Sequence, residues 1–394
     1  MRATLIYFLL MLSFGSFASE LNKLIEFAYR NNPKIKSYEN IKKSYLFRSN
    51  FAKSLPNPVI SLSLNNVETT RFLPRKENPM SGFVLFVSQK YPLPAKRNKS
   101  STIFKEKSFE IEFSKESFIK ELEKRLKILY WEFSYSFEME RILRDIEKEI
   151  RSLIEITEEK YRYGKALLSD LILLRVELLK VEEKLSQARK LRETTLSRIH
   201  ALAGGKVELS GSDLEQLPFP ESFDPEKNVS VRLFRQQLKV IKSEVERAKV
   251  EHYPDLFLSA GYMLRSEIPD LFTLRLGLTL PVWYGSRERM LVLEKKERLS
   301  SKLFEIADVK LRVTGDFEAF RSEYRITDEI LKTVKKEIEE KQKEISALLI
   351  AYEYDRTDIR EILRAYRILW DLEFQKAMLI KNLNQVVAKA EALQ

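Results

Sequence analysis

The stretch from Phe272 to Pro281 constrains the fold more than any other, because large apolar and smaller or polar residues alternate along it without a break. The large apolar side chains are Phe272, Leu274, Leu276, Leu278 and Leu280. The residues between them are Thr273, Arg275, Gly277 and Thr279. A period of two is that of a β-strand, so the apolar side chains share one face. Such a strand fits a soluble two-layer fold or a membrane barrel, whose strands are ~9–11 residues long.

Three further segments predict strands, and the first of them shows the same contrast. In the first, the apolar residues are Ile60, Leu62 and Leu64, and the polar ones between and after them are Ser61, Ser63 and Asn65. The other two segments run from Phe83 to Tyr91 and from Leu256 to Leu264. Together with the opening stretch they predict two strand hairpins, over residues 59–91 and 255–281.

Long helices are predicted between and after these hairpins. From Asn98 to Arg162 there is neither proline nor glycine, and apolar residues recur at spacings of three and four. This period predicts a helix that extends on the order of 95 Å at 1.5 Å per residue. Gly164 ends it, and a return helix completes a helical hairpin over residues 98–203. A second helical hairpin covers residues 286–392, with a break at Gly315 and a polar turn from Asp355 to Asp358.

The order of these elements occurs twice. Short helices over residues 21–29, 34–53 and 231–251 precede the strand hairpins, and residues 204–230 form a turn-rich connector. Phe83 and Phe272 occupy equivalent places, 189 residues apart (from 83 to 272), and Tyr163 and Tyr354, before the two turns, are 191 apart. The nearly equal offsets predict an internal duplication, with structural repeats over residues 19–203 and 231–394.

The N-terminal residues 1–18 resemble a secretory signal peptide, with basic Arg2, a short apolar run and a small residue, Ala18, before the cleavage site. No later segment has enough consecutive apolar residues to predict a membrane helix. The chain has no Cys, which excludes a disulfide framework and an N-terminal lipidated cysteine. Its net charge of +11 is spread over interspersed charges of both signs, which favours solvated helices over a nucleic-acid site.

Four strands per chain leave two open edges, which lipid does not tolerate. If the strands enter a membrane, the chain must therefore oligomerise. Two copies would give eight strands and a filled barrel, and three would give twelve strands around a water-lined lumen. Aromatic residues at the strand ends suit a membrane interface: Tyr91, Trp283 and Tyr284. The alternative is a small soluble sheet at the end of a helical bundle, and the signal peptide and long helices favour the membrane.

The sequence resembles the TolC-type outer-membrane efflux proteins over nearly all of its mature length. The resemblance is carried by Asn32-Pro33, the segment from Leu55 to Pro58, the segment from Gln89 to Arg97, the turn at Gly164 followed by Asp170, and the duplication. The proline-rich segments are most similar to the heavy-metal branch, the CzcC and CusC type.

The resemblance implies a mainly α fold with a membrane β-barrel contribution: a homotrimer that closes a twelve-stranded barrel in the outer membrane of a Gram-negative-type cell, continued by a periplasmic helical barrel. It also implies a passive exit duct, not an enzyme, for metal ions or drugs. The implied partners are a periplasmic adaptor protein, an inner-membrane transporter of the RND type, and outer-membrane lipid, and no nucleic acid. Two alternatives remain: a periplasmic adaptor, or an exported coiled-coil structural protein without channel activity.

In such a barrel one strand face meets lipid and the other lines the lumen. The lipid-facing candidates are Ile60, Leu62, Leu64, Leu274, Leu276, Leu278 and Leu280. The lumen candidates are Ser61, Ser63, Thr273, Arg275 and Thr279. Arg275 is the sharpest test of this assignment, because a guanidinium facing lipid would contradict it.

The two helical turns would form the periplasmic entrance. Asp170 and Glu361 each lie six residues after a turn position, and three copies of each would form an acidic ring that gates by repulsion or by pairing with Arg356 or Arg360. Further candidates in and near these turns are Gly164, Asp355 and Asp358. The simpler interpretation is that acids near a helix start cap it and complement its dipole. Asp355 stands where the first turn has Gly164, and Asp adopts left-handed geometry less readily, which predicts a turn of different shape.

The sequence predicts no cofactor and no metal site. His200 and His252 are far apart and have no neighbours in a ligand pattern. The scattered methionines Met80, Met263 and Met290 fit a packing role better than soft metal ligation.

Overall fold

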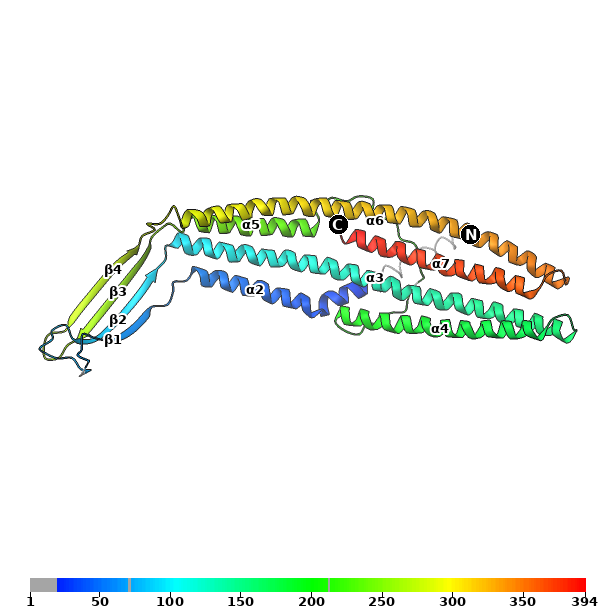
Figure 1. The fold of residues 1–394 in the computed structure, drawn as a ribbon, viewed down its shortest axis with the longest axis horizontal. Helices are drawn as coiled ribbons and strands as arrows, with labels where there is room; N and C mark the ends of the chain where they lie inside the picture. The colour runs from blue at the N-terminus through cyan, green and yellow to red at the C-terminus, as the bar shows by residue number, and fades with distance from the viewer. Residues whose placement is uncertain (1–19, 70–71, 212) are drawn as a thin grey trace, which may run out of the picture. The chain divides into compact units, whose positions relative to one another are not determined.

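The computed structural model of the chain describes residues 20–69, 72–211 and 213–394 (Figure 1). The predicted signal peptide, residues 1–18, lies outside the described residues. A short helix covers residues 20–31. The elements that follow are α2 (Pro33–Lys53), β1 (Val59–Asn65), β2 (Gly82–Tyr91), α3 (Pro94–Arg162), α4 (Leu168–Ala203), α5 (Val229–Lys249), β3 (Asp255–Leu264), β4 (Leu271–Thr279), α6 (Glu288–Glu353) and α7 (Ile359–Glu391).

The predicted strands and long helices are therefore confirmed as elements, with one correction. The break expected at Gly315 was wrong, because α6 continues through this residue without interruption. Gly315 is exposed, and a Cβ added to it would meet nothing within 4 Å. One glycine costs a helix interior only about 1 kcal/mol relative to alanine, which the cooperativity of a 66-residue helix easily absorbs.

The four strands form one antiparallel sheet in the order β1-β2-β3-β4. The central pair, β2 and β3, joins the two halves of the sequence, with Leu85 opposite Tyr262. The same row continues outward to Leu62 in β1 and Phe272 in β4. Strands β1 and β4 are the edges of this sheet in the described chain.

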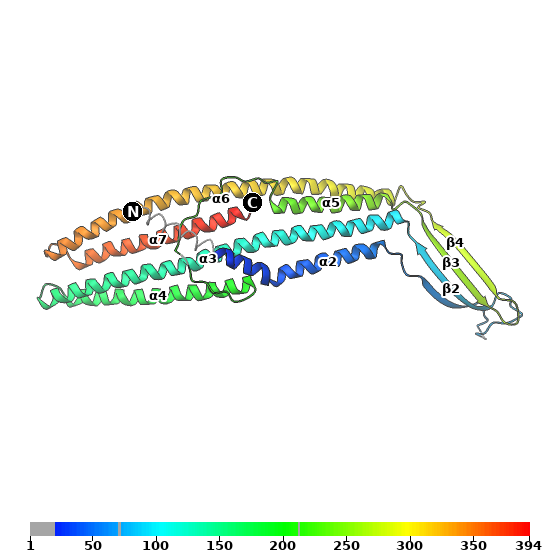
Figure 2. The ribbon, with the colours of Figure 1, turned by 180° about the vertical axis from the view of Figure 1, so that it is seen from behind.

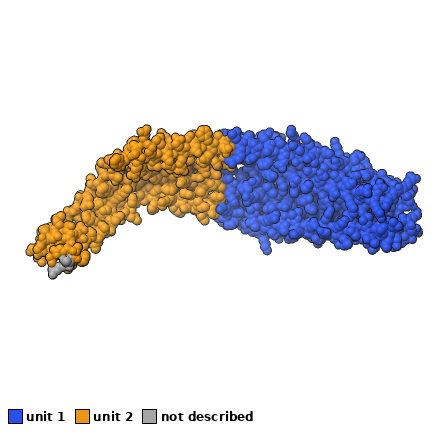
Figure 3. Space-filling model, in the orientation of Figure 1, with its two compact units in different colours: residues 1–36, 116–229, 310–394 blue, residues 37–115, 230–309 orange. Residues whose placement is uncertain are grey.

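The chain divides into two compact units, which Figure 3 colours separately. Unit 1 contains the described residues up to 36, then 116–229 and 310–394. Unit 2 contains residues 37–115 and 230–309, including the whole sheet. Each unit draws on both of the predicted repeats, so the duplicated halves do not form separate compact bodies.

In unit 1 the two helical hairpins pack around a continuous apolar core. The C-terminal part of α3 runs beside α4, and that of α6 runs beside α7 (Figures 1 and 2). The largest fully buried side chains are Trp131, Tyr130 and Phe133 of α3 and Phe317 of α6. Leu126, Tyr130 and Phe133, all buried on α3, are four and three residues apart, as the period seen in the sequence predicts. This period turns one stripe of the helix inward.

The connector is held against α7 by hydrogen bonds and against α6 by an aromatic contact, neither of which the sequence revealed. Asn384 of α7 is fully buried; its Oδ1 accepts from the Leu217 N–H at 2.8 Å and its Nδ2 donates to the Glu215 carbonyl at 2.7 Å. Phe223 of the connector stacks on Phe317, with ring centroids 4.6 Å apart. The buried amide satisfies the backbone of a segment that lacks regular structure of its own.

Within the described residues, none of the helices has the length and apolarity needed to cross a membrane.

Candidate functional site

The two faces of the sheet differ in the way that the alternation predicts. The strand register places all the lipid-facing candidates within the strands on one face, together with Leu85, Leu258 and Tyr262. We call this the apolar face. Most of its large apolar side chains are exposed: Leu62 is 73% exposed and Leu276 is 75% exposed. Leu280, the remaining candidate, follows the end of β4 and is 62% exposed.

The opposite face, which we call the polar face, holds all five lumen candidates. Ser61 and Thr273 lie in one row, with Phe86 and Gly261 between them. Arg275 lies in the next row beside Ser259, and Thr279 lies opposite Asp255. The register thus keeps Arg275 off the apolar face, and the assignment of the two faces to lipid and lumen stays a prediction.

Two aromatic rings on the polar face were missed from the sequence. A Cβ on Gly261 would lie 2.5 Å from the Phe86 ring, and a Cβ on Gly277 would lie 1.9 Å from the Phe257 ring. Each glycine is the cross-strand partner of the ring that covers it. The missing side chains therefore make room for rings that lie across neighbouring strands. The two glycines were visible in the sequence, but only the strand pairing identifies the aromatic ring that packs over each of them.

Arg275 is also held by an aromatic contact. Its guanidinium carbon lies 5.2 Å from the centroid of the Phe86 ring. A cation over an aromatic face is attracted by the ring quadrupole. The guanidinium therefore lies along the polar face on the same ring that covers Gly261.

The two helical turns of unit 1 have the same geometry, contrary to the expectation for Asp355. Gly164 has φ +71° and Asp355 has φ +55°. The N–H after each turn residue bonds back five residues, from Lys165 to the Lys160 carbonyl and from Arg356 to the Ala351 carbonyl, both at 2.8 Å. Both helices thus end in a left-handed stop of the Schellman type. The predicted difference in shape was wrong, because Asp tolerates this region as a single residue.

Asp355 has ionic partners that a glycine could not have. Its Oδ1 accepts from Lys160 Nζ at 2.5 Å and its Oδ2 from Lys165 Nζ at 2.7 Å. Both lysines belong to the other hairpin, and Lys160 also lies 4.1 Å from the centroid of the Tyr352 ring. Hydrogen bonds from Lys160 and then Lys165 lower the pKa of the Asp355 carboxyl to about 2. The carboxylate therefore joins the tips of the two hairpins.

Asp170 is the second link between the hairpins. Its Oδ1 accepts from Arg360 Nη2 of α7 at 3.2 Å, and its Oδ2 accepts from the Leu167 N–H at 3.2 Å. The carboxyl is 8% exposed. Asp170 therefore caps the start of α4, as the simpler interpretation held, and also pairs with the arginine that was predicted as its gate partner.

Three of the remaining tip candidates have local roles. Asp358 is the N-cap of α7 and accepts from the Arg360 N–H at 3.3 Å. Glu361 accepts a hydrogen bond from the Thr357 hydroxyl at 2.6 Å. The Arg356 guanidinium lies 5.9 Å from the Tyr354 ring centroid. These contacts lie within the second turn, so Asp355 and Asp170 are the candidates that link the two hairpins.

Solved structures with this architecture are outer-membrane channels. CusC, studied for transmembrane channel formation, superposes with a TM-score of 0.78 at 11% identity, over 95% of this chain and 92% of that one. VceC of Vibrio cholerae gives 0.75 at 13% identity, over 95% and 96%. The open MtrE channel of Neisseria gonorrhoeae gives 0.75 at 12% identity, over 95% and 88%.

This chain has the TolC-type fold. The resemblance inferred from the proline and turn motifs is thereby confirmed at the level of the fold. No protein-family model matches the sequence, and no curated protein matches it at a significant level. The fold was therefore predicted from short motifs and from the order and spacing of the elements, without overall sequence similarity to a known protein.

Each of the two histidines contacts a nearby backbone carbonyl. His200 Nε2 lies 2.9 Å from the Val207 carbonyl oxygen, and His252 Nδ1 lies 2.5 Å from that of Lys249. In the described part of the chain, no group of three or more His, Cys, Asp or Glu side chains is placed to hold a metal ion. The two imidazoles therefore serve local backbone contacts.

The Asp355 link predicts a defined pH dependence. Because folding lowers the Asp355 pKa from 3.8 to about 2, this carboxylate stabilises the folded tip above pH 3.8 and loses that effect as pH falls towards 2. We expect Asp355→Asn to lower the melting temperature at pH 5–7 and to have a much smaller effect near pH 2.

Calorimetry of the wild type and of Asp355→Asn from pH 2 to pH 7 measures the difference between their melting temperatures. The control is Asp316→Asn, at an exposed position of α6. A melting-temperature difference for Asp355→Asn that persists unchanged at pH 2 would contradict the role of the ion pairs.

Proposed function

We propose that the chain is the outer-membrane exit duct of a tripartite efflux system. It acts as a homotrimer and a passive conduit from the periplasm to the exterior, and it works with a periplasmic adaptor and an inner-membrane transporter of the RND type. The observation that carries this proposal is the TolC-type fold, matched over 95% of the chain by channel structures. The apolar and polar faces of the sheet support it independently.

The sheet explains why several copies are needed. Its edges, β1 and β4, offer unpaired backbone groups within the described chain, and lipid cannot satisfy them. Pairing β1 of one copy with β4 of the next closes the sheet, and three copies give twelve strands. In that barrel the apolar face meets lipid and the polar face, with Arg275 and the serine and threonine hydroxyls, lines a wet lumen.

The hairpin tips form the gate in this proposal. The Asp355 pairs with Lys160 and Lys165, and the Asp170 pair with Arg360, hold the two hairpins of one chain together. An opening that separates the hairpins must break these contacts. The gate therefore depends on ion pairs as well as on like charges gathered in a ring.

The duct does not select its cargo through a dedicated site in this proposal. We infer metal ions or drugs as cargo, and the similarity of the proline segments to the heavy-metal branch favours metal ions. Selection then lies in the transporter, because a wide water-filled lumen with serine and threonine side chains discriminates weakly. Growth of a deletion strain on copper, silver or drug plates, with and without the gene, separates the two cargo classes.

The test of the duct itself combines mass and conductance. We expect the detergent-solubilised protein to have the mass of three chains and to form ion-conducting pores in planar bilayers. Recovery in the periplasmic fraction without detergent would favour the adaptor or the exported coiled-coil protein instead. A particle of one or two copies would contradict the trimer even if the protein is membrane-bound.

A further inference from the structure

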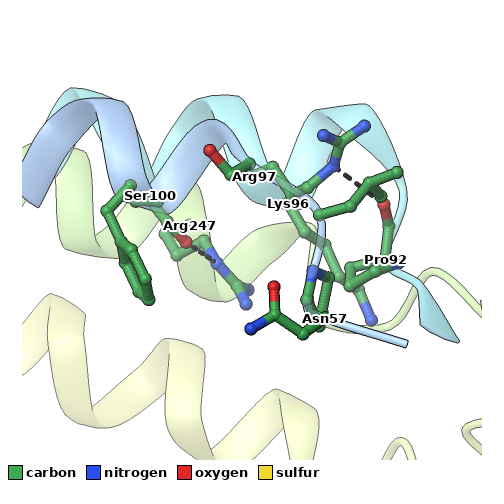
Figure 4. Close-up of a pocket in the computed structure, with 11 residues that line it drawn as sticks. Asn57, Pro92, Lys96, Arg97, Ser100 and Arg247 are labelled. Carbon is green, nitrogen blue, oxygen red and sulfur yellow. Dashed lines mark hydrogen bonds between the residues drawn. The ribbon is translucent and has the colours of Figure 1, made fainter. Parts of the chain in front are cut away.

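A basic pocket in unit 2 gathers the proline motifs that the channel function leaves unexplained. It has a volume of about 380 Å³ and is lined from three sides: by residues between 51 and 57, at and just after the end of α2, by residues between 92 and 100, at and just before the start of α3, and by Arg247 of α5 (Figure 4). The Leu55–Pro58 segment and the Lys96-Arg97 pair, which carried the family resemblance, both contribute to it. These motifs are distant in sequence, so only the fold brings them to one cavity.

The pocket carries an excess of positive charge. Lys96, Arg97 and Arg247 line it, and none of the described residues that line it is acidic. Lys96 pairs with Asp255 at 2.9 Å, which also pairs with Lys90 at 3.2 Å.

Arg247 pairs with Glu251, and its Nε donates to the Ser100 hydroxyl at 2.8 Å. The Arg97 guanidinium donates to two backbone carbonyls, those of Lys53 at 2.5 Å and Pro92 at 3.2 Å. Three lining cations are thus accompanied by two carboxylates, those of Asp255 and Glu251, and both carboxylates lie outside the lining.

The remaining lining fits one end of an amphipathic ligand. In Figure 4 the Asn57 side chain points toward Arg247, so an amide is available as a further donor. Apolar residues complete the wall: Phe51, Leu55, Pro56 and Pro92. Tyr91, which precedes Pro92, ends β2 in the same row as Leu278 of β4, and Trp283 lies just beyond that end and is 71% exposed. Exposed aromatic residues at strand ends are typical of the boundary between lipid tails and headgroups.

We propose that this pocket binds the phosphate group of a phospholipid headgroup. Guanidinium and ammonium groups bind phosphate through charge-assisted hydrogen bonds, and arginine does so with two parallel donors. The apolar wall and the neighbouring aromatics suit the glycerol and acyl part of the same molecule. The lipid source rests on the proposed outer-membrane function, whereas the preference for a phosphate anion rests on the pocket alone.

The test adds a negative charge to the pocket without removing any of the contacts described above. Asn57→Asp is nearly isosteric and lies at an exposed lining position. Its matched control is Asn98→Asp, an exposed position of α3 outside the lining, where the same charge is added nearby. The probe is phosphatidylglycerol bound to the detergent-solubilised protein, measured by native mass spectrometry.

We expect Asn57→Asp to weaken phosphatidylglycerol binding about tenfold, because a like charge within a few ångströms opposes the phosphate. Asn98→Asp should bind as the wild type does. Equal binding by all three proteins would overturn the proposal. So would equally tight binding of a diacylglycerol with the same acyl chains, which lacks phosphate.

A second titration tests whether the bound phosphate group belongs to a lipid or to free phosphate. Inorganic phosphate is added to the protein in lipid-free detergent, and binding is measured by calorimetry. Phosphate binding that Asn57→Asp weakens, in a protein that retains no phosphatidylglycerol, would support an anion site and overturn the lipid as its occupant. Conductance is measured separately in planar bilayers. Failure of the channel function would abolish conductance in wild type and variants alike, whereas failure of this proposal leaves conductance intact.

Discussion

Leu274→Arg is expected to prevent stable insertion into the outer membrane, whereas Thr273→Arg is expected to be tolerated. The two positions are adjacent in β4, so they share strand, depth and exposure, and they differ only in face. An arginine in contact with lipid near the bilayer midplane costs about 2–4 kcal/mol per chain, and a trimer contains three of them. On the polar face the same arginine meets water in the proposed lumen, as Arg275 does.

The measurement is the fraction of each variant recovered as a detergent-resistant trimer from the outer-membrane fraction. Leu274→Met, which keeps the position apolar, controls for disturbance of the strand itself. If Thr273→Arg is lost from the membrane and Leu274→Arg is retained, the inside and outside of the sheet are reversed. Equal recovery of both arginine variants would argue that the sheet does not face lipid at all.

Asp355→Asn combined with Asp170→Asn is expected to open the periplasmic tip. The double variant removes the two carboxylates that join the hairpins at their tips, while the Arg367–Glu177 pair between α7 and α4 remains. The amide oxygen of Asp170→Asn can still accept the hydrogen bond from the Leu167 N–H that starts α4. Lys160, Lys165 and Arg360 then lose their carboxylate partners at the tip. Because three chains contribute, we expect a roughly tenfold increase in the open fraction.

Single-channel recording in planar bilayers measures this increase. The matched control is Glu158→Gln, which removes the ion pair with Arg175 at 3.0 Å. That pair joins α3 and α4 of one hairpin, so its loss should leave the open fraction unchanged. An equal rise in both variants would indicate general loosening of the helices, and no rise in the double variant would remove these two acids from the gate.

Much of the fold followed from local patterns. Strict alternation located β4, and the three- and four-residue spacing located α3, because each element exposes one face to a different environment along its whole length. Gly164 marked the first turn through its backbone freedom. The same local reasoning failed at two positions. Gly315 does not break α6, because a long helix tolerates one glycine. Asp355 adopts the same left-handed geometry as Gly164, and its carboxylate has ionic partners in the other hairpin.

The candidate site was predicted less completely than the fold. Alternation sorted the strand residues into two faces, and the register of the sheet agrees with that sorting. Alternation could not predict the packing of the Phe86 and Phe257 rings, because each ring covers a glycine on another strand. Local reasoning placed Asp170 correctly near a helix start and named Arg356 or Arg360 as its partner, but only the structure shows that the partner is Arg360, 190 residues away.

The sequence by itself determined which residues form strands and helices and which side chains share a face, since these depend on residues within a few positions of one another. Only the tertiary structure decided that β2 pairs with β3 across the two halves, that Asn384 holds the connector, and that Asp355 joins the hairpin tips. It also decided that the proline motifs meet at one basic pocket. Those contacts link distant segments, and the free energy of such a contact depends on partners that no local pattern specifies.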